Sequence, residues 1–339
     1  VITLTVSPRA TRRRTTAEPM KPLPPATTTL AMGEPYPPTP SRFPGGTVGR
    51  MEIGIGLPNA VLRAGGDQVL AWARRAEERG FSTLATVDRV NYPTYDSLVA
   101  LAAAAGATQR IGLTTNVLLG PVYEPLILAR QTASLALLSG GRLRLGLGIG
   151  ARADDFEASG KDFSDRGKRF DALLDTLHAA WRGDDLVPSV GTTPVSLVPS
   201  AVDIPVLIGG QPRFAAPRAA KWNAAWTIGG GGLELIGKGI AVFREEWERA
   251  GGEGEPRFVA RVDFSLGDDL VAESRENLRT YYAFVGPYVD AVVEAAPRTP
   301  DAIRMAIDGY AALGIEELVF SPTATDVAQV DRLADVAFR

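Results

Sequence analysis

Two glycine-rich turns are the parts of this sequence best suited to binding a ligand. Gly209-Gly210 follows one short apolar segment, Gly229–Gly232 follows the next, and a helical segment comes after each turn. Glycine lets the backbone approach an oxyanion closely, and N–H groups at a helix N-terminus favour a phosphate. Either turn alone is equally well explained as a tight connection. Two in succession favour a phosphate site, with Gly209, Gly210, Gly229 and Gly230 as donors.

A third glycine-rich segment, GLGIGA at 146–151, formally matches the dinucleotide-binding pattern G-x-G-x-x-G/A. That pattern should open a helix directly, whereas a polar stretch of about 15 residues here precedes the next helical segment. We therefore interpret Gly148 and Gly150 as positions where a strand passes close to a flat ligand.

Several polar residues lie at or just after predicted strand ends. Asp88 and Arg89 end one strand, where they could form a salt bridge or a proton-transfer site, and the second role requires a raised Asp88 pKa. Asn116 is polar within an apolar strand end, so it should face a ligand rather than a dry core.

Candidate substrate contacts are Tyr92, Tyr123 and Arg152 in the loops, and Arg166 or Arg169 at the start of a helix. A solvated, capped helix start with Arg–Asp pairing explains the last two equally well. The single histidine, His178, lies on the flank of a helical apolar face and is interpreted as structural.

Composition excludes several kinds of chemistry. The chain has 339 residues, no Cys and one His, which excludes thiol catalysis, disulfides, Cys-ligated metals and a multi-His metal site within one chain. We expect no metal. A net charge of −3 shows no basic excess for nucleic acid, and no apolar stretch approaches the roughly 20 residues of a membrane span. A cytoplasmic protein is expected.

Strand and helix patterns alternate from Met51 onward. Strands are predicted at Met51–Leu57, Ser82–Val87, Arg110–Val117, Arg142–Ile149, Pro205–Gly209, Ala224–Gly229, Phe258–Leu266 and Glu317–Ser321. Helices are predicted at Asp67–Arg79, Tyr95–Ala105, Glu124–Leu138 and Arg166–Trp181, and at about 212–221, 233–250, 270–283, 300–313 and 326–337. Eight such units predict a (β/α)8 barrel over 51–339, with a doubly wound open sheet as the alternative. In a barrel, the polar loops named above meet at one end.

Residues 1–50 differ in composition, with 10 of the 25 prolines, 7 Lys and Arg residues and no periodic apolar pattern. This predicts a disordered extension. Since residue 1 is Val and Met51 opens the first strand, we hypothesise that translation starts at Met51.

From Met51 the chain resembles the luciferase-like monooxygenase family, whose members use FMN or the deazaflavin coenzyme F-420. The resemblance rests on motifs in the family's order. They are GIGLP (54–58), GFSTLATVDR (80–89), RIGLTTNVLLGP (110–121), ARQTASLALLSGGRLRLGLGIG (129–150), RGKRFDALLDTLHAAWRG (166–183) and IPVLIGGQPRFAAPRAAKWNAAWTIGGG (204–231).

The resemblance implies an isoalloxazine ring lying across the strand ends, supported by a non-prolyl cis peptide bond that maps to Asn116-Val117. It also implies a phosphate at Gly209-Gly210 and Gly229-Gly230. The family's sugar-phosphate dehydrogenases carry a His and a Glu where this chain has Arg89 and, approximately, Ala151. That activity is therefore not expected.

Three functions remain open. The leading expectation is a monooxygenase that uses O2 and reduced FMN from a separate reductase to oxygenate a small organic substrate. The second is a coenzyme F-420-dependent hydride-transfer enzyme, and the third is a non-catalytic flavin-binding protein. A homodimer is expected, and no nucleic acid or membrane partner.

Overall fold

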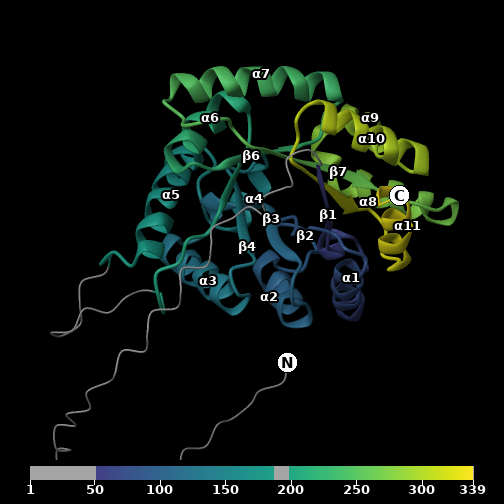
Figure 1. Ribbon diagram of the computed structural model, residues 1–339, viewed down its shortest axis with the longest axis horizontal. Helices are drawn as coiled ribbons and strands as arrows, with labels where there is room; N and C mark the ends of the chain where they lie inside the picture. Colours follow the sequence, from purple (N-terminus) through teal and green to yellow (C-terminus); the bar gives the residue numbers. More distant parts are fainter. Residues whose placement is uncertain (1–50, 187–197, 339) are drawn as a thin grey trace, which may run out of the picture. The chain divides into compact units, whose positions relative to one another are not determined.

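The computed structural model describes residues 51–186 and 198–338. The predicted extension at 1–50 lies outside the described residues. Eight parallel strands form a closed barrel in chain order, with β8 pairing to β1, so the open-sheet alternative is excluded (Figure 1). The strands are β1 (Glu52–Gly56), β2 (Thr83–Thr86), β3 (Gly112–Leu119), β4 (Leu143–Gly148), β5 (Val206–Gly209), β6 (Ala225–Gly229), β7 (Phe258–Phe264) and β8 (Glu317–Pro322).

Helices surround this barrel. They are α1 (Gly66–Glu78), α2 (Ser97–Ala107), α3 (Pro125–Leu138), α4 (Ala153–Ala158), α5 (Arg166–Arg182), α6 (Pro212–Trp222), α7 (Leu233–Arg249), α8 (Val271–Tyr281), α9 (Val289–Ala295), α10 (Pro300–Ala312) and α11 (Ala328–Ala337). Short 3-10 turns lie at η1 (Pro58–Ala60), η2 (Gly120–Val122), η3 (Asp268–Leu270) and η4 (Ala283–Tyr288). Within the described ranges, no helix combines the length and apolarity needed to cross a bilayer.

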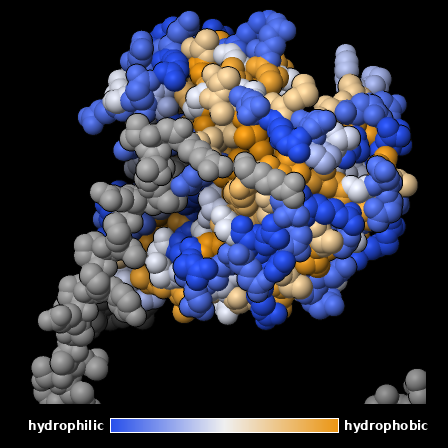
Figure 2. Space-filling model, turned by 45° about the vertical axis from the view of Figure 1, so that its right-hand side comes forward, coloured by the Kyte–Doolittle hydropathy of each residue, from blue (hydrophilic) through white to orange (hydrophobic). Residues whose placement is uncertain are grey.

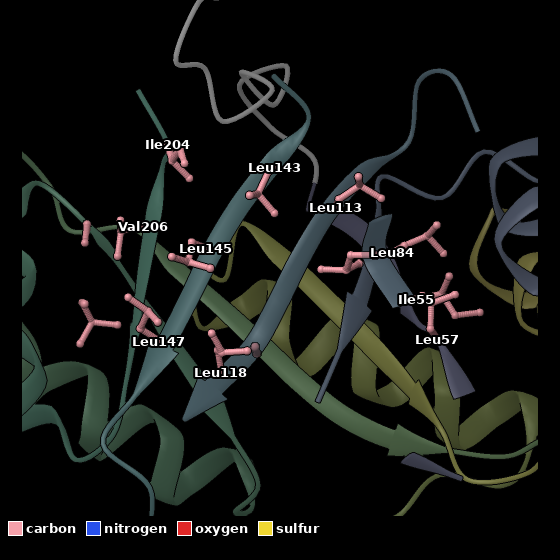
Figure 3. Close-up of a cluster of buried hydrophobic side chains, with 14 of the residues drawn as sticks. Ile55, Leu57, Leu84, Leu113, Leu118, Leu143, Leu145, Leu147, Ile204 and Val206 are labelled. Atoms are coloured by element: carbon pink, nitrogen blue, oxygen red, sulfur yellow. The ribbon is translucent and has the colours of Figure 1, made fainter. Parts of the chain in front are cut away.

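Strand residues alternate between the barrel interior and the layer beneath the helices. The outer layer is the larger core, and Figure 3 shows its leucines and isoleucines from neighbouring strands side by side, including Leu113, Leu145 and Leu147. A small inner cluster of Ala85, Leu207, Ala225, Val259 and Val319 fills the barrel itself. On the face drawn in Figure 2, hydrophilic residues cover much of the surface and apolar residues gather in its middle.

A buried ion pair closes the end of the barrel at which the strands begin. Arg144 on β4 donates to Glu317 at the start of β8 over 2.5 Å, and both side chains are almost completely buried. The Ser82 hydroxyl also donates to Glu317, and Arg144 Nη2 also donates to the Thr83 hydroxyl. The loops that carry the predicted site residues lie at the opposite end of the barrel, where the strands end.

Three predicted boundaries were wrong. The segment 150–164, predicted as a loop, contains α4, and its first turn carries Asp154 and Asp155. The chain after β7 forms two helices, α8 and α9, rather than one. Strand β3 continues to Leu119 through a register shift between Thr115 and Leu118, so Asn116 and Val117 lie inside the strand.

Candidate functional site

The upper end of β3 forms a bulged platform. The Asn116–Val117 peptide bond is cis, as the family resemblance implied. A Cβ added at Gly146 would lie 2.0 Å from the Thr115 carbonyl oxygen, and one at Gly148 would lie 2.8 Å from a Val117 methyl. These β4 glycines thus make room for the β3 bulge itself. Gly148 therefore packs against Val117, and its closeness to a flat ligand stays a prediction.

Asn116 is buried and points toward β6. Its Oδ1 accepts a hydrogen bond from Thr227 Oγ1 at 2.8 Å, whereas its Nδ2 is buried without a hydrogen-bond partner. Leaving a buried amide N–H unpaired costs roughly 1–3 kcal/mol, so such a group usually awaits an acceptor. Asn116 therefore presents an unpaired NH2 group, with two N–H donors, near the end of β6.

The two glycine turns end adjacent strands. Gly209 pairs in register with Thr227, and the Trp226 indole N–H donates to the Gly210 carbonyl at 3.0 Å. Gly210 and Gly230 have positive φ angles of 123° and 73°, and nothing lies within 4 Å of a Cβ added at either. The turns thus leave open space in front of the N-termini of α6 and α7, as a phosphate cradle requires.

Asp88 and Arg89 do not pair with each other. Asp88 is buried, and its carboxylate accepts from the Leu119 N–H at 3.0 Å and the Tyr123 hydroxyl at 3.1 Å. Burial raises the pKa of Asp88 to about 6, against the opposing effect of these hydrogen bonds. Asp88 thus carries the raised pKa that a proton-transfer role requires, and it holds the chain that follows the Asn116–Val117 platform.

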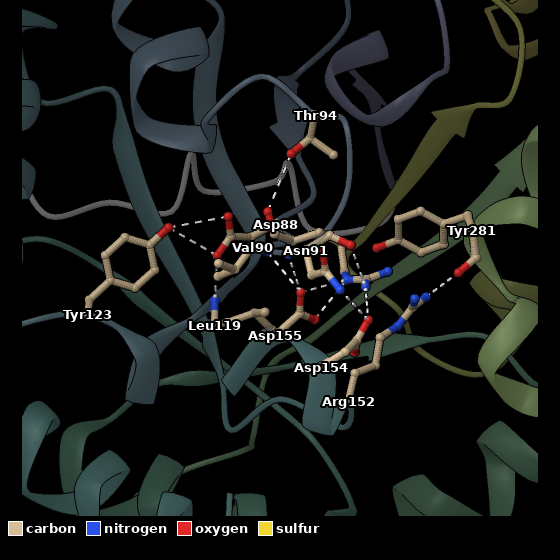
Figure 4. Close-up of polar contacts among 11 residues, drawn as sticks. Asp88, Val90, Asn91, Thr94, Leu119, Tyr123, Arg152, Asp154, Asp155 and Tyr281 are labelled. Carbon is tan, nitrogen blue, oxygen red and sulfur yellow. Dashed lines mark hydrogen bonds and ion pairs between the residues drawn. The ribbon is translucent and has the colours of Figure 1, made fainter. Parts of the chain in front are cut away.

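Arg89 instead reaches the first turn of α4. Its Nε donates to Asp155 at 2.7 Å and its Nη2 to Asp154 at 3.0 Å. Asp155 also accepts from the backbone N–H groups of Val90 and Asn91 (Figure 4). This buried network joins the β2 and β4 loops. It could not be predicted from the sequence because α4 was not recognised.

An aromatic and cationic cluster borders the same loops. Tyr92 packs edge-on against Tyr281 of α8, with ring centroids 5.4 Å apart. The Arg152 guanidinium lies 4.9 Å from the Tyr281 ring centre and 3.8 Å from that of Phe284, and it donates to the Tyr281 carbonyl. Burial lowers the pKa of Arg152. Tyr92 and Arg152, both predicted, are thus brought together by Tyr281, which was not.

A polar triad formed by β7 and the residue that follows α8 also escaped prediction. Arg261 donates to Asp263 at 2.6 Å and to the Tyr282 hydroxyl at 2.6 Å, and that hydroxyl donates to Asp263 at 2.8 Å. Although burial opposes it, the adjacent Asp263 raises the pKa of Arg261. A signal existed, since Arg261 and Asp263 are charges two apart in an apolar strand and so share its inner face.

The remaining predicted residues lie farther from these groups. Arg166 donates to the Phe163 carbonyl and stacks on that ring at 3.8 Å, while Arg169 pairs with Asp165 at 2.8 Å. His178 stacks on Trp222, with ring centroids 3.9 Å apart, which supports its structural interpretation, and burial lowers its pKa to about 4. Gly150 has a φ of 75° and packs against Phe156.

Together these groups define a barrel whose mouth combines a bulged platform with an unpaired amide, two open glycine turns and a buried carboxyl of raised pKa. The chain belongs to the luciferase-like monooxygenase family, whose model matches residues 51–319. This family includes oxidoreductases that depend on coenzyme F-420 as well as monooxygenases.

The individual relatives share less than a third of their aligned residues with this chain. The chain is 29% identical over 209 residues to an uncharacterized protein of Mycobacterium tuberculosis, covering 53% of this chain and 71% of that protein. It is 26% identical over 220 residues to the F-420-dependent glucose-6-phosphate dehydrogenase of Kribbella flavida, covering 60% and 64%. Its fold resembles an F-420-dependent secondary alcohol dehydrogenase in complex with an F-420–acetone adduct, with a TM-score of 0.71 at 18% identity, covering 85% and 98%.

Proposed function

We propose that this protein is an oxidoreductase that binds a flavin-type coenzyme across the ends of β3 to β6. The observation that carries the proposal is the position of the Asn116–Val117 platform beside the two glycine turns. The unpaired Asn116 Nδ2 fits a ring acceptor, and the open space at Gly210 and Gly230 fits a phosphate. Such a coenzyme supplies the redox chemistry when it is bound.

The residues of the chain would bind, orient and exchange a proton. The N–H groups of the Gly209-Gly210 and Gly229-Gly230 turns hold the phosphate, aided by the positive ends of α6 and α7. Val117 supports the ring and Asn116 donates to its edge. Asp88, with a pKa raised to about 6, can take up and release a proton near that pH and exchange it with solvent or substrate through the Tyr123 hydroxyl.

We place coenzyme F-420 first among the coenzymes, with hydride transfer as the reaction. The support is the Kribbella dehydrogenase, a curated relative of named activity that depends on this coenzyme. A sugar phosphate is not its expected substrate, since Arg89 is held by Asp154 and Asp155 where the family's dehydrogenases place a His.

The second candidate is oxygenation of a small organic substrate with O2 and reduced FMN from a separate reductase. The family description, luciferase-like monooxygenase, favours it. On either alternative we propose a cytoplasmic enzyme, and a homodimer.

Fluorescence titration of the purified protein with F-420 and with FMN tests the proposal. We expect F-420 to bind at least about tenfold more tightly than FMN, a difference of roughly 1.4 kcal/mol. Tighter binding of reduced FMN, with substrate-dependent O2 consumption, would select the monooxygenase. If neither coenzyme binds, the proposed function is wrong; binding without turnover of any tested substrate would favour a non-catalytic flavin-binding protein.

A further inference from the structure

A pocket opens into the barrel mouth on the side of β1, β2, β7 and β8, across from the glycine turns. Its cavity volume is about 40 Å³, and α8 forms its outer wall. Its walls are largely apolar, with Leu57, Val61, Ala85, Val87, Leu278 and Pro322 among the lining residues. Nothing in the coenzyme site proposed above occupies this space.

The ionised groups of this pocket balance each other. Arg261 and Asp263 are the lining residues that carry charge, and their side chains meet at 2.6 Å. The Tyr282 hydroxyl bridges the pair, and burial raises the pKa of Tyr282 and of its neighbour Tyr281, so both stay neutral. Arg89 and Arg152 contact Tyr281 but do not line the pocket. The lining is therefore electrically neutral.

Arg261 also connects the pocket with the coenzyme site. It pairs in register with Gly229, and a Cβ added at Gly229 would lie 3.9 Å from Arg261 Nε. A ligand in the pocket thus lies next to the end of β6, where the proposed coenzyme binds. Ser321, on the inner face of β8, adds a hydroxyl to the lining.

We propose that this pocket binds the substrate, and that the substrate is a compact, uncharged, mainly apolar molecule with a carbonyl or hydroxyl oxygen. Its apolar part packs on the Leu57, Val61 and Leu278 side, and its oxygen faces Ser321 and Arg261. An anionic substrate is rejected because its charge would be buried beside Asp263, with the Arg261 cation already neutralised. This inference deepens the proposed function and rests on it for the role of substrate.

Fluorine NMR titration with two probes of similar shape tests the pocket. The probes are para-fluoroacetophenone, which is neutral, and para-fluorobenzoate, which is anionic. We expect the wild-type protein to bind the ketone at least about tenfold more tightly than the carboxylate. Equal or tighter binding of the carboxylate would overturn the proposal.

Charge and access variants locate the binding. Asp263→Asn leaves the Arg261 charge without its carboxylate, so carboxylate affinity should rise at least about tenfold. The control Asp290→Asn removes an exposed carboxylate that pairs with Arg279, and should change neither affinity. If Asp263→Asn and Asp290→Asn changed carboxylate affinity equally, the Arg261–Asp263 pair would not be what excludes the anion.

Ala60→Trp, at the half-buried rim of the pocket, should abolish binding of the ketone, whereas Ala102→Trp on the exposed side of α2 should not. Ala60 lies on the rim, so this variant remains informative if Asp263→Asn does not fold. Unchanged ketone binding in Ala60→Trp would show that the probe binds elsewhere. The two fluorinated probes bind without a coenzyme, so the pocket is tested independently of the F-420 and FMN titrations. If those titrations fail, the proposed function is refuted, while the probe titrations still decide which class of ligand the pocket binds.

Discussion

Asp88 should make the stability of this protein depend on pH in the opposite sense to an ordinary surface carboxylate. Its pKa of about 6 exceeds the ordinary Asp value of 3.8 because the carboxyl is buried. The difference of about 2.2 corresponds to roughly 3 kcal/mol, at about 1.36 kcal/mol for each pKa unit. The folded state therefore binds this proton more tightly than the unfolded state does.

The sign follows from that difference. The contribution of Asp88 to stability is fully present below pH 3.8 and is lost as the pH rises through about 6. Asp88→Asn replaces the carboxyl with a neutral amide whose oxygen can still accept from the Leu119 N–H. Relative to wild type, the variant should gain up to roughly 3 kcal/mol of unfolding free energy between pH 4 and pH 8.

Urea denaturation of both proteins at several pH values measures this gain. Asp290→Asn is the matched control, because Asp290 is exposed and its removal should produce no comparable trend. A constant difference between Asp88→Asn and wild type across this range would refute the reasoning, whatever the size of the difference. The reasoning would also be refuted if Asp88→Asn lost stability relative to wild type as the pH rises.

Three further predictions concern the coenzyme site and the barrel. Gly229→Val should weaken binding of FMN or F-420 at least about tenfold and spare riboflavin, which lacks the phosphate. The folded protein has room for the valine side chain at Gly229, so the loss reflects the phosphate, whereas Gly210→Val adds backbone strain at a φ of 123°. Equal losses for FMN and riboflavin would indicate misfolding instead. Asn116→Leu should weaken coenzyme binding or turnover in a folded protein, and unchanged titrations and kinetics would remove Asn116 from the site. Glu317→Gln should lower the unfolding free energy by about 3–5 kcal/mol, because it removes the carboxylate that neutralises buried Arg144; denaturation that matches wild type would contradict this.

Much of the fold was predictable because its signals are local. Each strand is a short apolar run bounded by turn residues. Most long helices carry a one-sided apolar pattern, and α2 and α3 are instead apolar over most of their surface. The six-residue helix α4 was missed because it is too short to show that periodicity. The seven-residue helix α9 was missed as well, since the predicted helix ended at about residue 283, before the turn that contains Gly286 and Pro287.

The candidate site was only partly predictable. The glycine turns and Asn116 could be found because parallel strands bring their C-terminal ends to one rim, so position along the chain implies proximity. The partners of Asp88 and Arg89 could not be found this way. Tyr123 and Asp155 lie 35 and 66 residues farther along the chain, and only the closed barrel decides which loops touch.

By itself, the sequence determined the alternation of strands and helices, the end of the barrel that carries the site, and the absence of any cysteine chemistry. The tertiary structure alone decided that Gly146 and Gly148 accommodate the β3 bulge, that Asp88 is buried enough to raise its pKa, and that Arg261 is neutralised by Asp263 beneath Tyr282. The reason is physical. Propensity and periodicity depend on neighbours along the chain, whereas burial, charge balance and close packing depend on neighbours in space.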